Sequence, residues 1–415
     1  MPFVVAHVSD LHVSEFGDTF HDRLRVVKRS ANVAATDAAK FEIAWEEAGW
    51  RVFHERGKRR SKIALVDPEG YAHAVPSMKE GGGVIDPVER AATKACHLEA
   101  RRSLTLARHV PSAGALQGLF EGTPRNSNVR LLRAVQAIEE SNADAVVITG
   151  DVTDDGVGWE LVEAAFARWK DKGRLFVIPG NHDLYLFPLR GSGRPRATQE
   201  SKRAAWRAFA QRIGLELHES GGWYRHVPEA DSVFVGLDSC ARPQRRFFRH
   251  NGAIGPAQLA WLREIAARPE FKAARHRLVM LHHHVVPLPH GVGRRAPSEI
   301  GMRLDDARSA AEIFDEIGAT AVLHGHRHVS EQRQPAGSNF TILASPSLTL
   351  GCRSGDDPSF WRIDLDEHFR ASRVRVPVES MDQDEDPPES VAGVLVDSVV
   401  DLVTGDEEAD SERGR

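Results

Sequence analysis

The sequence predicts an α/β layered fold. Short apolar runs rich in β-branched residues recur along the chain and end in polar residues, which is typical of strands buried on both faces. Stretches with helical spacing of apolar residues lie between several of these runs, and this alternation favours helices packed on sheets. A length of 415 residues and a hydrophobic content of 41% suit two or three domains, or one large domain with insertions.

The elements follow from these patterns in chain order. We expect strands at 3–8, 145–149, 175–179, 233–237, 278–281, 320–323, 340–343, 361–365 and 374–378, and helices at 129–140, 159–170, 257–267 and 305–317. Helices separate the last strands less regularly, so the sequence is compatible both with one mixed sheet and with two packed sheets. We assign these elements to one domain over 1–378.

Residues 15–124 interrupt this alternation of strands and helices after the first strand. Short strands are expected at 50–55, 62–67 and 71–76. Asp86 and Pro87 then suit the N-cap and first turn of a helix that runs to about residue 108. We interpret 15–124 as a large inserted α+β subdomain, a meander plus a helix, which is either a structural appendage or a lid.

Charge is unevenly distributed. Residues 379–415 contain 13 Asp or Glu and two Lys or Arg, a net charge of −11, and we expect an acidic disordered tail there. The whole chain carries −5, so the remainder carries +6. A mildly basic body suits anionic ligands, but this charge is too small to argue for nucleic acid.

Cysteine usage and hydropathy bear on location. Cys96, Cys240 and Cys352 are far apart and lack CxxC spacing, which excludes a disulfide framework or a cysteine-zinc module and favours a reducing compartment. No run reaches the ~18 apolar residues of a membrane span. The N-terminus resembles a buried strand rather than a signal peptide, so we expect a cytoplasmic protein.

Metal-ligating residue types follow five of the expected strands. They are Asp10 and His12, Asp151, Asn181 and His182, His282 to His284, and His326 and His328. Carboxyl ends of strands form the functional edge of open α/β sheets, so we expect these side chains to meet. Asp, Asn and His without thiolate suit Mn, Fe or Zn, and the number of candidates fits two ions sharing a carboxylate.

The local spacing supports this hypothesis. Asp10 with His12, and His326 with His328, are two residues apart, and on an extended backbone such side chains point the same way. Glycines precede Asp151, Asn181 and His326. They permit tight turns and close approach of neighbouring backbone.

These blocks resemble the calcineurin-like metallophosphoesterase superfamily. The matching segments, in family order, are Asp10-Leu11-His12, Gly150-Asp151-Val152-Thr153-Asp154, Gly180-Asn181-His182-Asp183, His282, and Gly325-His326-Arg327-His328. Leu237-Asp238-Ser239 and Gly255-Pro256-Ala257-Gln258-Leu259-Ala260-Trp261-Leu262 are most similar to the class III cyclic-nucleotide phosphodiesterase branch. The resemblance covers 1–14 and about 125–365, and it implies a four-layer sandwich of two mixed β-sheets flanked by helices.

The resemblance also implies two ligand sets. One metal would be held by Asp10, His12, Asp151 and His328, and the other by Asp151, Asn181, His282 and His326, with Asp151 bridging. His283 is the alternative to His282. His284 is expected in the pocket wall.

The implied chemistry is in-line attack of a metal-bridging hydroxide on a small phosphodiester, for which a 3′,5′-cyclic nucleotide is the leading substrate. His182 would protonate the leaving group, oriented by Asp154 or, alternatively, by Asp183. His324 and Arg327 would support neighbouring ligands.

Other functions stay open. The same fold could be a metal-binding scaffold without turnover, a nuclease or a phosphomonoesterase. Two groups of arginines could grip substrate phosphate or could be solvated loops: Arg190, Arg194 and Arg196, and Arg242, Arg245, Arg246 and Arg249.

Overall fold

The computed structural model describes residues 2–14, 127–154, 156–186, 198–241, 250–286, 302–351 and 357–376. Between 15 and 126 it describes 41–55, 63–66, 72–73, 88, 91–92 and 95–96. The expected acidic tail, Cys352 and both arginine groups lie outside these residues. So does most of the helix expected at 86–108, although residues 88, 91–92 and 95–96 are helical.

A five-stranded mixed sheet contains the first strand. Its order is β15 (Phe369–Arg375), β14 (Ser359–Leu365), β1 (Phe3–Val8), β6 (Ala145–Thr149) and β7 (Leu175–Ile178). β1, β6 and β7 are parallel, whereas β14 pairs antiparallel with both β1 and β15. The carboxyl ends of β1, β6 and β7 therefore meet at one edge.

A six-stranded mixed sheet forms the second layer. Its order is β12 (Glu331–Arg333), β13 (Thr341–Ala344), β11 (Ala321–His324), β10 (His276–Met280), β9 (Ser232–Gly236) and β8 (Trp223–Val227). The four central strands are parallel and the two edge strands are antiparallel. This arrangement shows the predicted α/β fold with two mixed sheets.

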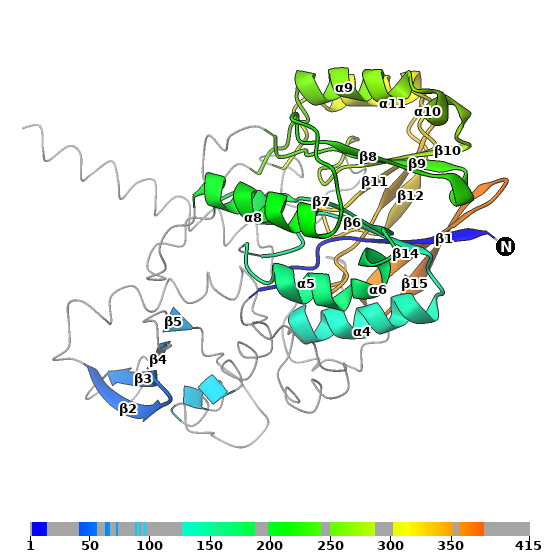
Figure 1. The fold of residues 1–415 in the computed structure, drawn as a ribbon. Helices are drawn as coiled ribbons and strands as arrows, with labels where there is room; N and C mark the ends of the chain where they lie inside the picture. Colours follow the sequence, from blue (N-terminus) through cyan, green and yellow to red (C-terminus); the bar gives the residue numbers. More distant parts are fainter. Residues whose placement is uncertain are drawn as a thin grey trace, which may run out of the picture.

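Helices cover the outer face of each sheet (Figure 1). α9 (Pro256–Ala266), α10 (Pro269–Ala273) and α11 (Ala307–Glu316) lie over the six-stranded sheet. α4 (Ser127–Glu140), α5 (Trp159–Ala165) and α6 (Ala167–Lys170) lie over the five-stranded sheet. The result is a four-layer sandwich, helix on sheet on sheet on helix.

Successive residues along the central strands point to opposite faces and so pack into different layers of the core. In β9, Phe234 belongs to the core between the sheets, whereas Val233 and Val235 pack with α9 and α11. In β10, Leu278 likewise belongs to the core between the sheets, whereas Val279 packs with the helices on the outer face. Burying both faces explains why these strands are continuous apolar runs rather than alternating patterns, and each fully buried Val, Leu or Phe contributes roughly 1.5–3 kcal/mol.

Several elements differ from the expectation. The helix expected at 159–170 is two helices, because buried Phe166 leaves helical geometry (φ −102°, ψ 18°). The last strand, β15, begins and ends earlier than the expected 374–378. α8 (Gln199–Arg212), β8 and the short helix α7 (Asn181–Leu184) were not predicted. α8 is largely polar, and Thr198 caps it by accepting a hydrogen bond from the Ser201 N–H.

The inserted segment contains a separate four-stranded antiparallel sheet. Its order is β2 (Phe41–Glu47), β3 (Trp50–Glu55), β4 (Ile63–Val66) and β5 (Ala72–His73). Three of these strands match expected positions, and β2 was not predicted. Trp50, Val52 and Leu65 form a small core with Ala91 and Ala95 from the helical positions.

Candidate metal centre

The predicted ligand residues follow the carboxyl ends of five strands drawn from both sheets. β1 leads to Asp10 and His12, β6 to Asp151, β7 to Asn181, β10 to His282, and β11 to His326 and His328. These parallel strands point their carboxyl ends to the same edge of the sandwich (Figure 1). The structure brings the seven residues together there in two clusters.

The first cluster contains Asp10, His12 and His328. Nε2 of His328 lies 3.2 Å from Oδ1 of Asp10, and the Nε2 atoms of His12 and His328 lie 3.0 Å apart. Asp10 is fully buried and His12 is 3% exposed, so water does not solvate their facing atoms. One ligand atom from each residue lies within 4.8 Å of the others.

The second cluster contains Asp151, Asn181, His282 and His326. Oδ1 of Asn181 lies 3.0 Å from Nε2 of His282 and 2.8 Å from Nδ1 of His326. Oδ2 of Asp151 lies 3.2 Å from Nε2 of His282. The structure therefore separates His326 from His328 and places them in different clusters.

Asp151 lies between the clusters. Its Oδ2 faces His282, whereas its Oδ1 accepts a hydrogen bond from the backbone N–H of His182 at 2.8 Å. Potential ligand atoms of Asp151, His12 and His182 also lie within 4.8 Å of one another. This position fits the bridging role that the sequence resemblance implies for Asp151.

The backbone that presents these residues is left-handed, not extended. The φ angles are 53° at Asp10, 48° at His12, 48° at Asp151, 73° at His326 and 48° at His328. The reasoning from an extended backbone was therefore wrong for both two-residue spacings. Such conformations cost of order 1 kcal/mol or more for residues other than glycine, and they concentrate at functional sites.

Glycines allow the close approach that the sequence predicted. A Cβ at Gly150 would collide with the imidazole of His282, and one at Gly180 with the backbone and carboxylate of Asp151. A Cβ at Gly325 would collide with Ser9 and with the Asp10 carboxylate. The three glycines thus let neighbouring strand ends approach within contact distance.

Carboxylates and imidazoles in and around the two clusters shift one another's pKa values toward the charged forms. Burial alone would raise the pKa of Asp151, but the charges of His282 and His182 hold it well below its usual range. Burial opposes protonation of His282 and His12, yet Asp151 raises the pKa of His282 to about 9 and Asp154 raises that of His12 to about 9. Without a cation the carboxylates therefore hold protons on these imidazoles.

Hydrogen bonds on the far side of each imidazole orient the ring. Nδ1 of His282 donates to the carbonyl of Thr149 at 2.8 Å, which leaves Nε2 toward Asp151. Nδ1 of His12 donates to Oδ1 of Asp154 at 2.9 Å, and Nε2 of His326 donates to the carbonyl of Met302 at 3.1 Å. Such outer partners fix the tautomer of metal-binding histidines.

The donor set fits a pair of cations. Oδ1 of Asp10 is buried and accepts no hydrogen bond from any residue that the structure describes. It faces the Nε2 atom of His328, and the amide oxygen of Asn181 faces two imidazole nitrogens. Lone-pair donors that converge in this way satisfy a cation better than they satisfy one another. The His/Asp clusters fit a dimetal site.

His182 lies at the edge of this centre. Its Nδ1 is 2.8 Å from Oδ1 of Asp154, and its side chain keeps 15% of its exposure. Asp183, the alternative partner, is turned away from it. The Asp183 carboxylate accepts hydrogen bonds from the N–H groups of Gly180, Val152 and Thr153, so it ties α7 to the loop after β6.

His283 and His284 do not join the clusters. Nδ1 of His283 lies 2.8 Å from Oγ of Ser239, and its Nε2 donates to the carbonyl of His250 at 2.7 Å. His284 is buried, and its ring lies 6.1 Å from that of His326, centre to centre. The arrangement favours His282 as the ligand.

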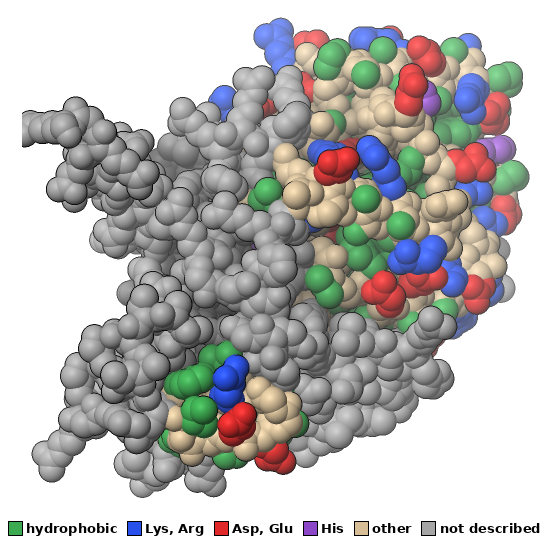
Figure 2. Space-filling view, turned by 60° about the vertical axis from the view of Figure 1, so that its left-hand side comes forward, with side chains coloured by type: hydrophobic (Ala, Val, Ile, Leu, Met, Phe, Trp, Pro, Cys, Tyr) green, Lys and Arg blue, Asp and Glu red, His purple; other side chains and the backbone are tan. Residues whose placement is uncertain are grey.

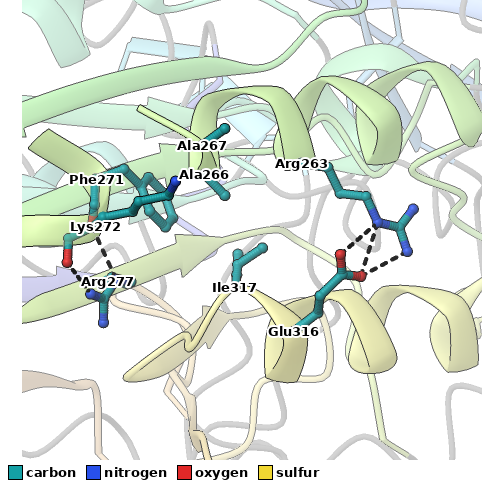
Figure 3. A pocket seen from close by; sticks show the side chains of 8 residues that line it. All are labelled: Arg263, Ala266, Ala267, Phe271, Lys272, Arg277, Glu316 and Ile317. Carbon is teal, nitrogen blue, oxygen red and sulfur yellow. Dashed lines mark hydrogen bonds and ion pairs between the residues drawn. The ribbon is translucent and has the colours of Figure 1, made fainter. Parts of the chain in front are cut away.

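A cavity of about 350 Å³ lies at the opposite edge, between α9, α10 and α11 (Figure 3). It is lined by Arg263, Ala266, Ala267, Phe271, Lys272, Arg277, Glu316 and Ile317. Arg263 pairs with Glu316, and Arg277 donates to the carbonyls of Phe271 and Lys272. The cavity contains none of the predicted ligands, and both of its arginines already have protein partners.

None of the helices in the described part of the chain combines the length and apolar character needed to cross a bilayer.

Comparisons with known proteins agree with this geometry. Residues 124–330, about half of the chain, match the family model of calcineurin-like phosphoesterases. This segment contains the predicted ligands from Asp151 to His328, whereas Asp10 and His12 follow the first strand. No curated protein has significant sequence similarity to the chain.

Solved structures are also similar. A purple acid phosphatase from yellow lupin (Lupinus luteus) has a TM-score of 0.42 and 13% identity, over 61% of this chain and 48% of that one. A dimetal phosphatase from Danio rerio has a TM-score of 0.40 and 16% identity, over 61% of this chain and 90% of that one. A 5′-nucleotidase, described as putative, from Staphylococcus aureus has a TM-score of 0.35 and 15% identity, over 61% and 50%. The matched region thus spans about half the length of the lupin and S. aureus chains.

The two Asp/His clusters at the strand ends and the family match over 124–330 lead to one assignment. The chain belongs to the calcineurin-like metallophosphoesterase superfamily, a family of phosphoric ester hydrolases.

Proposed function

We propose that this protein hydrolyses a small phosphodiester with a pair of transition-metal ions, Mn, Fe or Zn, held by the two clusters. The observation that carries the proposal is the shared position of Asp151, which faces His282 with one carboxylate oxygen and binds the His182 N–H with the other. Asp151 thus lies between the two ligand clusters and also binds the segment that carries the His182 imidazole.

Two bound cations would supply charge neutralisation at the phosphoryl group and a water of lowered pKa. Asp10, His12, Asp151 and His328 would hold one of them, and Asp151, Asn181, His282 and His326 the other. The oxygen-rich and imidazole-rich donor set suits Mn, Fe or Zn.

His182 acts on the leaving group. A partly exposed imidazole beside buried ligands can donate a proton or a hydrogen bond to the oxygen that departs from phosphorus. Asp154 stabilises the protonated imidazole and fixes the ring from the Nδ1 side. Both residues lie at the carboxyl ends of the five-stranded sheet, next to Asp151.

A 3′,5′-cyclic nucleotide is the first substrate to test. Support comes from the segments 237–239 and 255–262, which resemble class III cyclic-nucleotide phosphodiesterases. These segments are joined by hydrogen bonds, because Gln258 accepts from the Asp238 N–H and donates to the Asp238 carbonyl.

One face of the described residues supports a small substrate over nucleic acid. On the face seen in Figure 2, acidic and basic side chains of the described residues are interspersed rather than gathered into a basic strip. A nuclease needs such a strip to neutralise a phosphate backbone. We also propose a cytoplasmic location, which the free thiols of Cys96 and Cys240 support.

The test is a substrate panel on purified protein whose metal content has been measured. The panel contains a cyclic nucleotide, bis(4-nitrophenyl) phosphate, a glycerophosphodiester and a phosphomonoester. We expect diester turnover with Mn²⁺ and a loss of about 10²-fold or more in Asp151→Asn, and in His182→Ala a loss of that size for diesters whose leaving group needs a proton.

The alternatives have separate signatures. Bound metal without turnover across Mn, Fe, Co, Zn and Ni would support a scaffold and contradict the proposal. Cleavage of DNA or RNA that weakens steeply with salt would support a nuclease. Preference for the monoester would support a phosphatase.

A further inference from the structure

We propose that Lys202 is a positioning residue for His182, holding the imidazole where it can reach the leaving group. The inference deepens the proposed function and rests on the role assigned there to His182. Lys202 lies in α8, an element the sequence did not predict, and it is not among the predicted ligand residues.

Lys202 is buried, with 6% of its surface exposed. Fully burying an ammonium group is costly unless its protons are accepted by partners. Its Nζ donates to the carbonyl of His182 at 2.7 Å and to the carbonyl of Tyr185 at 2.9 Å. Two hydrogen bonds of this ammonium group are therefore made to the backbone of one segment, 182–185.

That segment is the short helix α7, which carries Asn181 and His182. The first carbonyl of α7, that of Asn181, accepts a hydrogen bond from the Tyr185 N–H, but a helix of four residues has no further turn to supply N–H donors to its later carbonyls. Lys202 binds the carbonyl at its second position and the carbonyl of Tyr185, where the chain leaves the helix. The cation thereby fixes the course of the chain through and beyond His182.

The peptide groups on both sides of the His182 Cα are thus anchored. The N–H of His182 donates to Oδ1 of Asp151, and its carbonyl accepts from Lys202. These two contacts restrict rotation of the backbone that bears the imidazole. The ring then keeps its 2.8 Å approach to Asp154.

The lysine stem also lies near the loop that follows Asp154, the other half of the pair. A Cβ at Gly156 would lie 3.5 Å from both Cγ and Cε of Lys202, so the stem lies against the loop that follows Asp154. One side chain therefore binds the segment of His182 and lies beside the loop that follows Asp154. A change at Lys202 is expected to alter the distance between them.

The test compares two diesters that differ in their need for a proton donor. Diphenyl phosphate releases a phenol that needs protonation, whereas bis(4-nitrophenyl) phosphate releases a stable phenolate. If Lys202 acts through His182, Lys202→Met lowers kcat for diphenyl phosphate about 10- to 100-fold and changes kcat for the nitrophenyl diester less than about threefold. Metal content stays at the wild-type value.

The second comparison asks whether the rate losses of the Lys202 and His182 variants add in the double variant. His182→Ala should show the same preference between the two diesters, and the double variant should lose no more than His182→Ala alone. Lys202→Arg, which keeps a cationic donor, should restore part of the lost rate. Arg207→Met, an exposed cation on the same helix, is the matched control and should behave as wild type.

A readout independent of turnover separates this inference from the proposed function. In ¹⁵N-labelled zinc-loaded protein, the imidazole signals of His182, assigned by their loss in His182→Ala, should shift or broaden in Lys202→Met. The signals of buried His7 should not change. Absence of turnover in wild type would contradict the proposed function without altering this expectation.

Three results would overturn the inference. One is equal loss on both diesters, and another is an unchanged His182 signal in Lys202→Met. The third is failure of both Lys202→Met and Lys202→Arg to fold, because that would make the lysine a determinant of core stability.

Discussion

Oδ1 of Asp154 lies 2.8 Å from Nδ1 of His182, and this carboxylate oxygen also accepts the hydrogen bond from Nδ1 of His12. One buried oxygen therefore orients a metal-ligand imidazole and the imidazole proposed to protonate the leaving group. The two rings lie edge to face, 4.8 Å apart between centres. We therefore expect metal affinity and leaving-group protonation to be linked through this carboxylate.

Substitution of Asp154 is expected to affect both properties. Asp154→Ala should weaken metal binding about 10- to 100-fold, because His12 loses the partner that fixes its tautomer. Turnover of a diester with a poor leaving group should fall further, because His182 loses the same oxygen. Metal titration and kcat measure the two effects, and Asp171→Ala, with a carboxylate side chain 71% exposed, is the control. Unchanged metal affinity would contradict the linkage.

The neighbouring histidines His282 and His283 should behave differently. His282→Ala removes a nitrogen that faces Asp151 and Asn181, so we expect loss of one of the two bound ions. His283→Ala removes contacts with Ser239 and His250 and should keep both ions while lowering the melting temperature. Metal analysis of the folded variants distinguishes the two, and metal loss only in His283→Ala would reverse the ligand assignment.

Glycine substitutions test the close packing of the strand ends. Gly325→Ala would place a methyl group against Ser9 and the Asp10 carboxylate, so we expect a loss of about 2–4 kcal/mol in unfolding free energy and weaker metal binding. Gly173→Ala is the matched control. At Gly173 a Cβ meets nothing within 4 Å, and the positive φ of 64° should cost only about 1 kcal/mol. Equal losses in denaturant unfolding would contradict this account.

Protonation should oppose metal binding. The pKa values of His12 and His282 are raised to about 9, so both imidazoles carry protons at pH 7 when no cation is bound. Cations must displace these protons, so affinity should rise between pH 7 and 9 and binding should release protons. Calorimetry in two buffers of different ionisation enthalpy measures this release. An affinity that is the same at pH 7 and 9 would contradict it.

The same shifts predict the stability of the metal-free protein. A histidine whose pKa is raised from 6.5 to about 9 stabilises the folded state fully below pH 6.5, and this contribution is lost as pH rises through 9. Denaturant unfolding of the metal-free protein should therefore give a lower free energy at pH 9 than at pH 7. The metal-loaded protein should lose less over this interval, because its imidazole ligands are already neutral.

Much of the fold could be predicted because its central strands are buried on both faces. Apolar runs such as 145–148 in β6 and 278–281 at the end of β10 stand out in sequence, and a predicted ligand follows each of them. The predicted ligand residues lie together because parallel strands direct their carboxyl ends to one edge. Asp154 was placed beside His182 by resemblance, and the structure has the two in contact.

The remainder depends on contacts that a local pattern does not encode. The left-handed backbone at Asp10 and His328 occurs just after β1 and β11, strands that belong to different sheets. α8 is polar over most of its surface, so its amphipathic signal is weak. Lys202 resembles an ordinary solvated lysine in the sequence, and only the folded chain shows its ammonium group on the carbonyls of α7.

Anomalous diffraction from crystals soaked in Mn²⁺ tests the central claim most directly. We predict two manganese peaks, one beside Asp10 and His328 and the other beside Asn181 and His282, with the Asp151 carboxylate between them. A single peak, or two peaks that do not share Asp151, would contradict the dinuclear centre.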